Sequence, residues 1–121
     1  MAVILIVEDD RSIRELVELI LEDGGYETLS ASDVEEATRY LSSRRPIDAL
    51  FTDIHLKAAA LGGCEVARIA TECRPGLPIM YTTAKFGYEK LKALLPKDAR
   101  FLKKPYTESD LLGSVENALG A

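Results

Sequence analysis

Residues 3–10 read VILIVEDD, five apolar residues that lead directly into three acids. A short, uninterrupted apolar run rich in β-branched residues is typical of a strand buried on both faces, as in parallel sheets. Two later runs end in charge as well: residues 49–52 lead into Asp53, and residues 101–102 lead into a lysine pair that ends at Lys104. Ligand chemistry in open α/β sheets takes place where the strands end. We therefore expect these acids and the lysine to meet at one edge of a parallel sheet.

Length and composition set limits on the class of protein. A chain of 121 residues predicts one domain, residues 1–121, with room for a single core. The net charge of −5 argues against nucleic acid or an anionic membrane as the main partner, since both attract clustered positive charge. No apolar stretch approaches the roughly 20 residues of a membrane span, and no signal-type segment follows Met1. A cytoplasmic protein is the default expectation.

Strand-like and helix-like segments alternate along the chain. After the first strand, apolar residues recur at the spacing of one helix face until Gly24 and Gly25 end the pattern. Helical crossovers between strands make the connections parallel and right-handed, and the predicted fold class is an α/β three-layer sandwich with a five-stranded parallel sheet. We expect strands at residues 3–7, 26–31, 47–52, 77–82 and 99–102, with the helix before the last strand at 88–95.

Two helix starts carry capping signals. Ser32 followed by Glu35 forms a capping-box pattern before the second helix. Thr107 or Ser109 can cap the final helix, because a side-chain oxygen there accepts from the first free amides.

Each charged residue has an ordinary explanation when it is taken alone. Acids after a strand often cap the next helix, an aspartate at a strand end is often a turn residue, and a lysine before proline is often a solvated loop charge. The joint pattern is more specific, because acids, a hydroxyl and a lysine each end a different strand. Clustered carboxylates repel one another unless a cation joins them, and oxygen ligands suit Mg²⁺.

A carboxylate can also act as a nucleophile and form an aspartyl phosphate. A metal, a lysine and a hydroxyl around the transferring group stabilise its charge. We expect Glu8 and Asp9 to bind Mg²⁺, Asp53 to attack, and Lys104 and Thr83 to hold phosphoryl oxygens.

The chain resembles the receiver domain of two-component response regulators over essentially its whole length. The resemblance is carried by LIVEDD at 5–10, Thr52-Asp53, PIMYTTA at 78–84 and FLKKPY at 101–106. It implies the flavodoxin-like sheet order 2-1-3-4-5, with Asp53 as the phosphorylated residue. It also assigns the other roles: an acidic pair at Glu8 and Asp9, a switch hydroxyl at Thr83, a switch aromatic at Phe101, and Lys104 joined to proline by a cis peptide bond.

The resemblance implies a signalling phosphoacceptor rather than an enzyme with a separate substrate, although the domain catalyses its own phosphotransfer and dephosphorylation. The phosphoryl donor would be a histidine kinase or a histidine phosphotransfer domain, and the start of the first helix, near Arg11 and Arg14, would dock it. Phosphorylation would draw Thr83 inward, let Phe101 fill the vacated space, and reshape the face made by the fourth helix, the fifth strand and the last helix. That face would bind a downstream protein or a second copy of the chain.

One stretch departs from the family pattern. Residues 54–63 read IHLKAAALGG, without the usual proline and with a loop that is one or two residues longer. His55 falls where the family supplies a backbone carbonyl to the metal, which makes it the fourth expected metal ligand after Glu8, Asp9 and Asp53. His55 and Lys85 also flank the expected path of water to the phosphoryl group. They would either shield it or simply point to solvent.

Other functions for this fold fit less well. An FMN-binding protein needs a hydroxyl- and glycine-rich phosphate loop after the first strand, and a dinucleotide-binding domain needs Gly-x-Gly-x-x-Gly there. An aspartate-nucleophile phosphatase usually carries a second acid two residues after the nucleophile, where this chain has His55. A receiver fold without phosphotransfer is the strongest rival, and the presence of all five site residues argues against it. The output, and whether the chain stands alone or belongs to a larger regulator, are not encoded here.

Overall fold

The computed structural model describes residues 1–56, 61–83, 93, 95 and 99–120. The helix expected at 88–95 and Lys85 therefore lie outside the described residues, apart from positions 93 and 95. The described elements are β1 (Val3–Val7), α1 (Arg11–Asp23), β2 (Glu27–Ala31), α2 (Val34–Leu41), β3 (Ala49–Asp53), α3 (Gly62–Cys73), β4 (Ile79–Thr83), β5 (Arg100–Lys103) and α5 (Glu108–Gly120).

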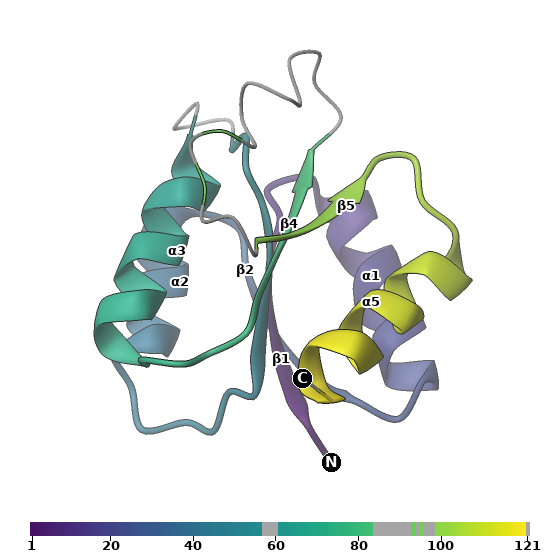
Figure 1. Cartoon of the computed structure of the whole chain (residues 1–121), viewed down its shortest axis with the longest axis horizontal. Helices are drawn as coiled ribbons and strands as arrows, with labels where there is room; N and C mark the ends of the chain where they lie inside the picture. The colour runs from purple at the N-terminus through teal and green to yellow at the C-terminus, as the bar shows by residue number, and fades with distance from the viewer. Residues whose placement is uncertain (57–60, 84–92, 94, 96–98, 121) are drawn as a thin grey trace.

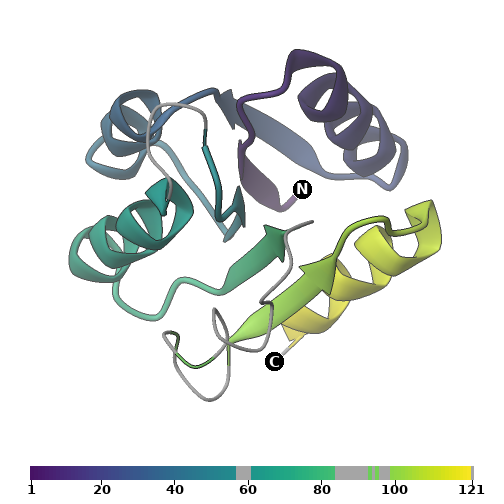
Figure 2. The same cartoon turned by 90° about the horizontal axis from the view of Figure 1, so that it is seen from above.

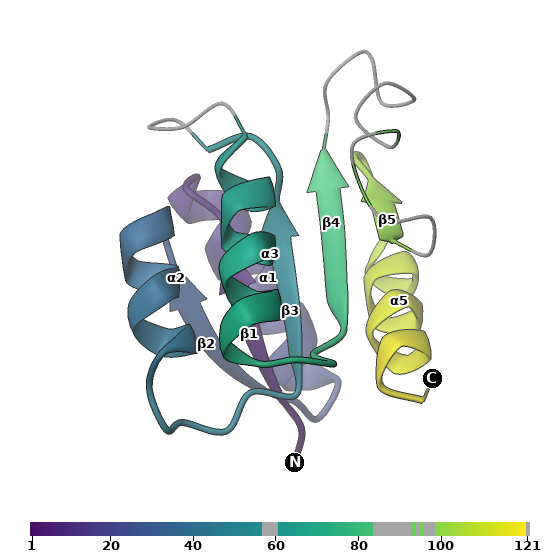
Figure 3. The same ribbon diagram turned by 60° about the vertical axis from the view of Figure 1, so that its left-hand side comes forward.

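All five strands form one parallel sheet in the order β2-β1-β3-β4-β5, which confirms the expected topology (Figure 3). The register aligns the carboxyl ends of neighbouring strands. Val7 pairs with Thr52, Asp53 pairs with Thr82, and Thr83 pairs with Lys103. The charged residues that follow these strands consequently begin from one edge of the sheet.

Helices cover both faces of the sheet, with α1 and α5 on one side and α2 and α3 on the other (Figures 1 and 2). Side chains of β1 alternate between the two resulting cores. Ile4 and Ile6 pack with residues of α1 and α5, whereas Leu5 and Val7 pack with residues of α2 and α3. Every residue of β1 is at most 5% exposed, which is why this strand reads as a continuous apolar run. Among the described helices, none is long and apolar enough to cross a membrane.

The cap of α2 lies one residue later than the sequence predicted. Asp33, rather than Ser32, precedes the first helical residue, and its Oδ1 accepts from the Glu36 amide at 2.8 Å. The Glu36 carboxylate reaches back and accepts from the Ser32 amide at 2.7 Å. At α5 the prediction of Thr107 is confirmed, since Thr107 Oγ1 accepts from the Asp110 amide at 3.0 Å and Asp110 Oδ2 accepts from the Thr107 amide at 3.0 Å.

Arg74, at the end of α3, joins the carboxyl ends of two helices. Its Nε donates to the carbonyl of Leu41 at 3.1 Å, and its Nη2 donates to the carbonyl of Ser43 at 2.8 Å. Carbonyls at a helix end lack partners within the helix and carry partial negative charge, so a guanidinium there satisfies both needs.

Replacing Arg74 by alanine should lower the free energy of unfolding by about 1–2 kcal/mol, because charged hydrogen bonds to helix-end carbonyls are lost. Urea unfolding followed by circular dichroism measures this. Arg44→Ala is the matched control: Arg44 is exposed on the loop after α2, and its loss should change the midpoint little. Equal midpoints for the Arg74 variant and the wild type would contradict the bridging role.

Candidate functional site

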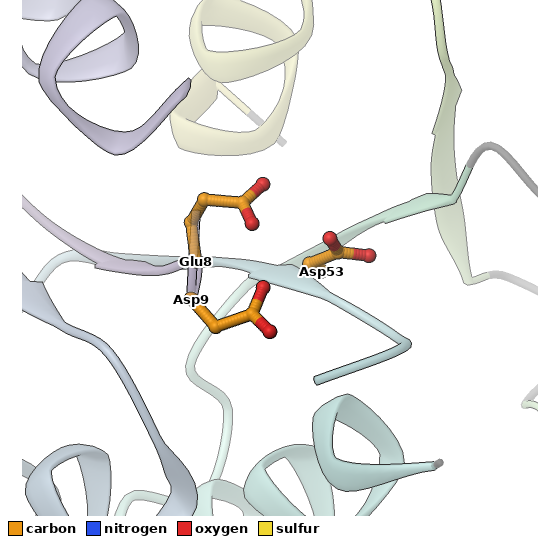
Figure 4. A group of neighbouring side chains, drawn as sticks. All are labelled: Glu8, Asp9 and Asp53. Carbon is orange, nitrogen blue, oxygen red and sulfur yellow. The ribbon is translucent and has the colours of Figure 1, made fainter. Parts of the chain in front are cut away.

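Three carboxylates meet at the carboxyl edge of the sheet, as the sequence predicted (Figure 4). Glu8 and Asp9 follow β1 directly, and Asp53 is the last residue of β3. One carboxylate oxygen from each lies within 4.8 Å of the others. Glu8 is 3% exposed and Asp53 is 7% exposed, while Asp9 is half-buried. Carboxylates that lie this close together and are this well buried require a compensating positive charge.

Lys104 supplies part of that charge. Its Nζ donates to Glu8 Oε1 at 3.0 Å and to Asp53 Oδ2 at 3.1 Å, so one ammonium bridges carboxylates from two strands. The Lys104 amide donates to the Thr83 carbonyl at 3.0 Å, which extends the β4–β5 pairing to the residue that carries the ammonium. The peptide bond between Lys104 and Pro105 is cis, as the family resemblance implied.

Burial and neighbouring charges shift the pKa values of Glu8 and Lys104. Burial raises the pKa of Glu8, and the charge of Asp53 raises it further, although Lys104 and the Asp10 amide act in the opposite direction. For Lys104, burial lowers the pKa, but the hydrogen bond to Glu8 and the charge of Asp53 outweigh it, so the net shift is upward. The lysine stays charged, so the cluster holds one positive charge beside three carboxyl groups. A divalent cation would add the positive charge that such a group of acids favours.

The third acid after β1 has a different role from its neighbours. Asp10 is the N-cap of α1, and its Oδ1 accepts from the Ile13 amide at 3.1 Å. Its own amide donates to Glu8 Oε2 at 3.1 Å, and Arg14 Nη1 donates to the Glu8 carbonyl at 2.8 Å. The helix-cap explanation therefore holds for Asp10, while α1 fixes the backbone and one oxygen of Glu8.

Gly63 allows α3 to approach the backbone of Asp53. The Gly63 amide donates to the Ile54 carbonyl at 2.9 Å. A methyl group at Gly63 would lie 2.0 Å from the Asp53 carbonyl oxygen and 2.6 Å from Cα of Ile54, which no side chain can tolerate without a backbone shift. In the sequence this glycine is only the last residue of the unusual stretch 54–63, because a close approach between distant segments leaves no local pattern.

The remaining predicted residues lie on β4, on β5 and directly after β3. Thr83 is fully buried at the end of β4, and Phe101 is half-buried on β5, paired in register with Tyr81. The His55 amide donates to Asp53 Oδ1 at 3.3 Å, and the His55 side chain is half-buried. That His55 gives the metal its carbonyl, and that Thr83 holds a phosphoryl oxygen, stay predictions. The proposed shield by Lys85 lies outside the described residues.

The model of the response regulator receiver domain family matches residues 4–116, and the chain belongs to this family. The nitrogen assimilation regulatory protein NtrX of Azorhizobium caulinodans is 34% identical over 117 residues, which are 96% of this chain but 26% of NtrX. The receiver protein CpdR of Brucella abortus is 35% identical over 118 residues, covering 96% of this chain and 95% of CpdR. A crystal structure of a response regulator receiver protein from Sinorhizobium medicae superposes with a TM-score of 0.88 at 31% identity, over 99% of this chain and 95% of that one.

Fold, acidic cluster and family agree on a class of function. The chain is a receiver domain of a two-component system, a signalling phosphoacceptor domain rather than a classical enzyme. Its acidic cluster is typical of a magnesium-binding site.

Glu8→Gln should raise the urea midpoint at pH 7, because the folded protein then no longer holds an ionised Glu8 whose pKa is raised. The pKa of Glu8 is raised in the folded protein, so ionisation of Glu8 lowers the stability of the wild type as pH rises through that pKa. The two proteins should therefore converge in stability as pH falls through the carboxylate range. Glu35→Gln, at a side chain that is 80% exposed, is the control and should have no comparable effect. A lower midpoint for Glu8→Gln at pH 7 would mean that pairing with Lys104 outweighs desolvation.

Gly63→Ala should destabilise the fold by about 1–3 kcal/mol, because its methyl group must displace the Asp53 backbone. Gly113→Ala is the matched control, since Gly113 lies within α5 and an added methyl group meets nothing within 4 Å. This second change should stabilise the protein by about 0.5–1 kcal/mol through helix propensity. Equilibrium unfolding of both variants measures the contrast. Similar effects of the two substitutions would show that the close approach at Gly63 carries no constraint.

Proposed function

We propose that Asp53 accepts a phosphoryl group in a Mg²⁺-dependent reaction with a histidine kinase or a histidine phosphotransfer domain. The observation that carries this proposal is the Lys104 ammonium, which holds Asp53 Oδ2 and Glu8 Oε1 together at 3.1 and 3.0 Å. Residues 1–121 would act as one receiver domain.

The donor set of the cluster fits Mg²⁺. All three ligand atoms that the cluster offers are carboxylate oxygens, and hard divalent cations prefer oxygen. Glu8, Asp9 and Asp53 would hold the ion, with the His55 carbonyl as the proposed fourth protein ligand. When bound, the ion would offset the charge that builds up on the phosphoryl oxygens during transfer.

Asp53 would be the nucleophile of the transfer. One of its carboxylate oxygens attacks phosphorus, the new P–O bond forms, and the P–N bond to the partner histidine breaks. The electron pair of that bond goes to the imidazole nitrogen, which then takes up a proton. Lys104 already contacts Asp53 and would hold one phosphoryl oxygen, and Thr83, at the end of the neighbouring strand, would hold another.

A groove beside the cluster offers a place for the phosphodonor to dock. It has a volume of about 530 Å³ and is lined by Ile13, Leu16, Val17, Ile20, Lys104, Pro105 and Tyr106. Leu16 is 56% exposed on α1 and adds apolar surface to this groove. Because Lys104 belongs both to this groove and to the acidic cluster, a helix seated there would carry its histidine next to Asp53.

The output of the domain would be a change in side-chain packing that follows phosphorylation. Capture of a phosphoryl oxygen by Thr83 would shift Phe101 and reshape the face of the fourth helix, β5 and α5, as a change in population between two packings. A downstream protein or a second copy of the chain would bind there. The chain spans about a quarter of NtrX and nearly all of CpdR.

Incubation with Mg²⁺ and a small phosphodonor such as acetyl phosphate should add a single phosphoryl group, measured by intact-mass spectrometry. The adduct should disappear in Asp53→Asn and without Mg²⁺, since the nucleophile or the charge compensation is then missing. Glu35→Gln serves as the acidic control and should be phosphorylated like the wild type. An adduct that persists in Asp53→Asn would falsify the assignment of the nucleophile.

A further inference from the structure

The segment that follows β5 contacts β3 at two points, which lie two residues apart on each segment. Lys104 Nζ donates to Asp53 Oδ2 at 3.1 Å. The ring of Tyr106 meets the ring of Phe51 edge to face, with 6.2 Å between the centroids and an interplanar angle of 80°. Phe51 and Asp53 are alternate residues of β3, so both project to the same face of the sheet. An ion pair and an aromatic contact therefore join the same two segments.

Phe51 is a fixed surface for the Tyr106 ring. It is 2% exposed and belongs to the core cluster that also contains residues of α1 and α5. Tyr106 is half-buried and packs against this cluster. The edge-to-face arrangement is favoured for aromatic pairs and adds to the free energy gained by burying the rings. Tyr106 is consequently held against the strand that ends at Asp53.

The backbone of Lys104 is held from the side of β4 by a hydrogen bond, in which its amide donates to the Thr83 carbonyl at 3.0 Å. The next residue, Pro105, is exposed and has no amide hydrogen to donate. Tyr106 is thus the first packed residue after Lys104. A lysine side chain has a flexible four-carbon stem, so the position of its ammonium depends on how the backbone near it is held.

The Tyr106 hydroxyl lies near the charged cluster. Burial raises the pKa of this hydroxyl. The charge of Lys104 lowers the same pKa, whereas the charges of Glu8 and Asp53 raise it. Tyr106 and Lys104 also line the same groove beside the cluster. The ring is therefore close to the ion pair as well as to Phe51.

We propose that Tyr106 is a positioning residue for Lys104. By packing on Phe51, its ring holds the lysine against Asp53. This inference rests on the proposed function, in which the Lys104 ammonium holds an oxygen of the phosphoryl group. Without the ring, the ammonium would occupy a wider range of positions and meet the phosphoryl group in fewer of them. Loss of an aromatic pair changes such an equilibrium by about two- to tenfold.

Tyr106→Leu and Tyr106→Phe separate the aromatic ring from its hydroxyl. The first measurement is the initial rate of phosphorylation by acetyl phosphate with Mg²⁺, followed by intact-mass spectrometry. The second is hydrogen exchange of the Lys104 ammonium, followed by NMR without metal or phosphodonor. We expect Tyr106→Leu to lower the rate about two- to tenfold and to accelerate the exchange. Tyr106→Phe should match the wild type in both, because the ring remains.

Tyr26→Leu is the matched control for a loss of stability. Tyr26 packs against the same core cluster but stands before the start of β2, whereas the charged cluster lies at the ends of the strands. This variant should lower the midpoint of urea unfolding without changing the phosphorylation rate or the Lys104 exchange. The affinity of Tyr106→Leu for Mg²⁺ alone should not fall, because the metal ligands are unchanged. Tyr106→Met takes the place of Tyr106→Leu if the latter does not fold.

The inference is overturned if Tyr106→Leu leaves either the rate or the exchange at the wild-type value. It is also overturned if Tyr106→Phe loses as much as Tyr106→Leu, or if Tyr26→Leu changes both measurements as strongly. A fall in Mg²⁺ affinity by the same factor would show a general loss of the site instead of a displaced lysine. Failure of the proposed function would look different, because the wild type itself would take up no phosphoryl group. The exchange of the Lys104 ammonium would then still decide whether Tyr106 holds the lysine.

Discussion

Lys104 makes the contact on which the rest of the site depends. Its ammonium lies about equally far from Glu8 and Asp53, at 3.0 and 3.1 Å, and both carboxylates are almost fully buried. Buried like charges repel strongly because little water screens them, so Glu8 and Asp53 depend on the Lys104 ammonium for compensation. Burial is the main cause of the raised pKa of Glu8, and the contacts with Lys104 do not fully offset it. A site in this electrostatic state favours any ligand that adds positive charge, and the proposed Mg²⁺ is such a ligand.

The parallel sheet is what brings these charges together. β1, β3 and β5 deliver Glu8, Asp53 and Lys104 from positions far apart in the chain, and the register aligns their ends. The other side of Asp53 is set by α3, whose Gly63 lies against the Asp53 carbonyl and donates its amide to Ile54. Asp53 is thus fixed from the sheet through β3 and from the helix layer through Gly63. These two constraints fix the direction in which the Asp53 carboxylate points at the edge of the sheet.

The sequence predicted the parallel strands and the meeting of the charged residues because burial leaves a one-dimensional pattern, whereas the sheet order came from the family resemblance. Runs such as Val3–Val7 are visible without knowing their neighbours. The different roles of Glu8, Asp9 and Asp10 left no such pattern. Asp10 caps α1, and its φ and ψ angles of −77° and 115° are not visible in the sequence. Ile47 was expected in a strand because it is apolar, and it is indeed buried, but β3 begins only at Ala49, which pairs with Ile4. Long-range contacts, of which Gly63 is the clearest, required the fold itself.

β5 and the loop that follows it carry two important groups. Lys104 compensates the charge of Asp53, and Phe101 is the ring of the proposed switch. Phe101 pairs in register with Tyr81, and three residues later Lys104 reaches Glu8 and Asp53. The Lys104 amide also donates to the Thr83 carbonyl at 3.0 Å, which connects the end of β5 to β4. A phosphoryl group on Asp53 would compete with Glu8 for the Lys104 ammonium and act on Thr83 at the same time. Both demands would act on the ends of β4 and β5, where Thr83 and Lys103 pair in register.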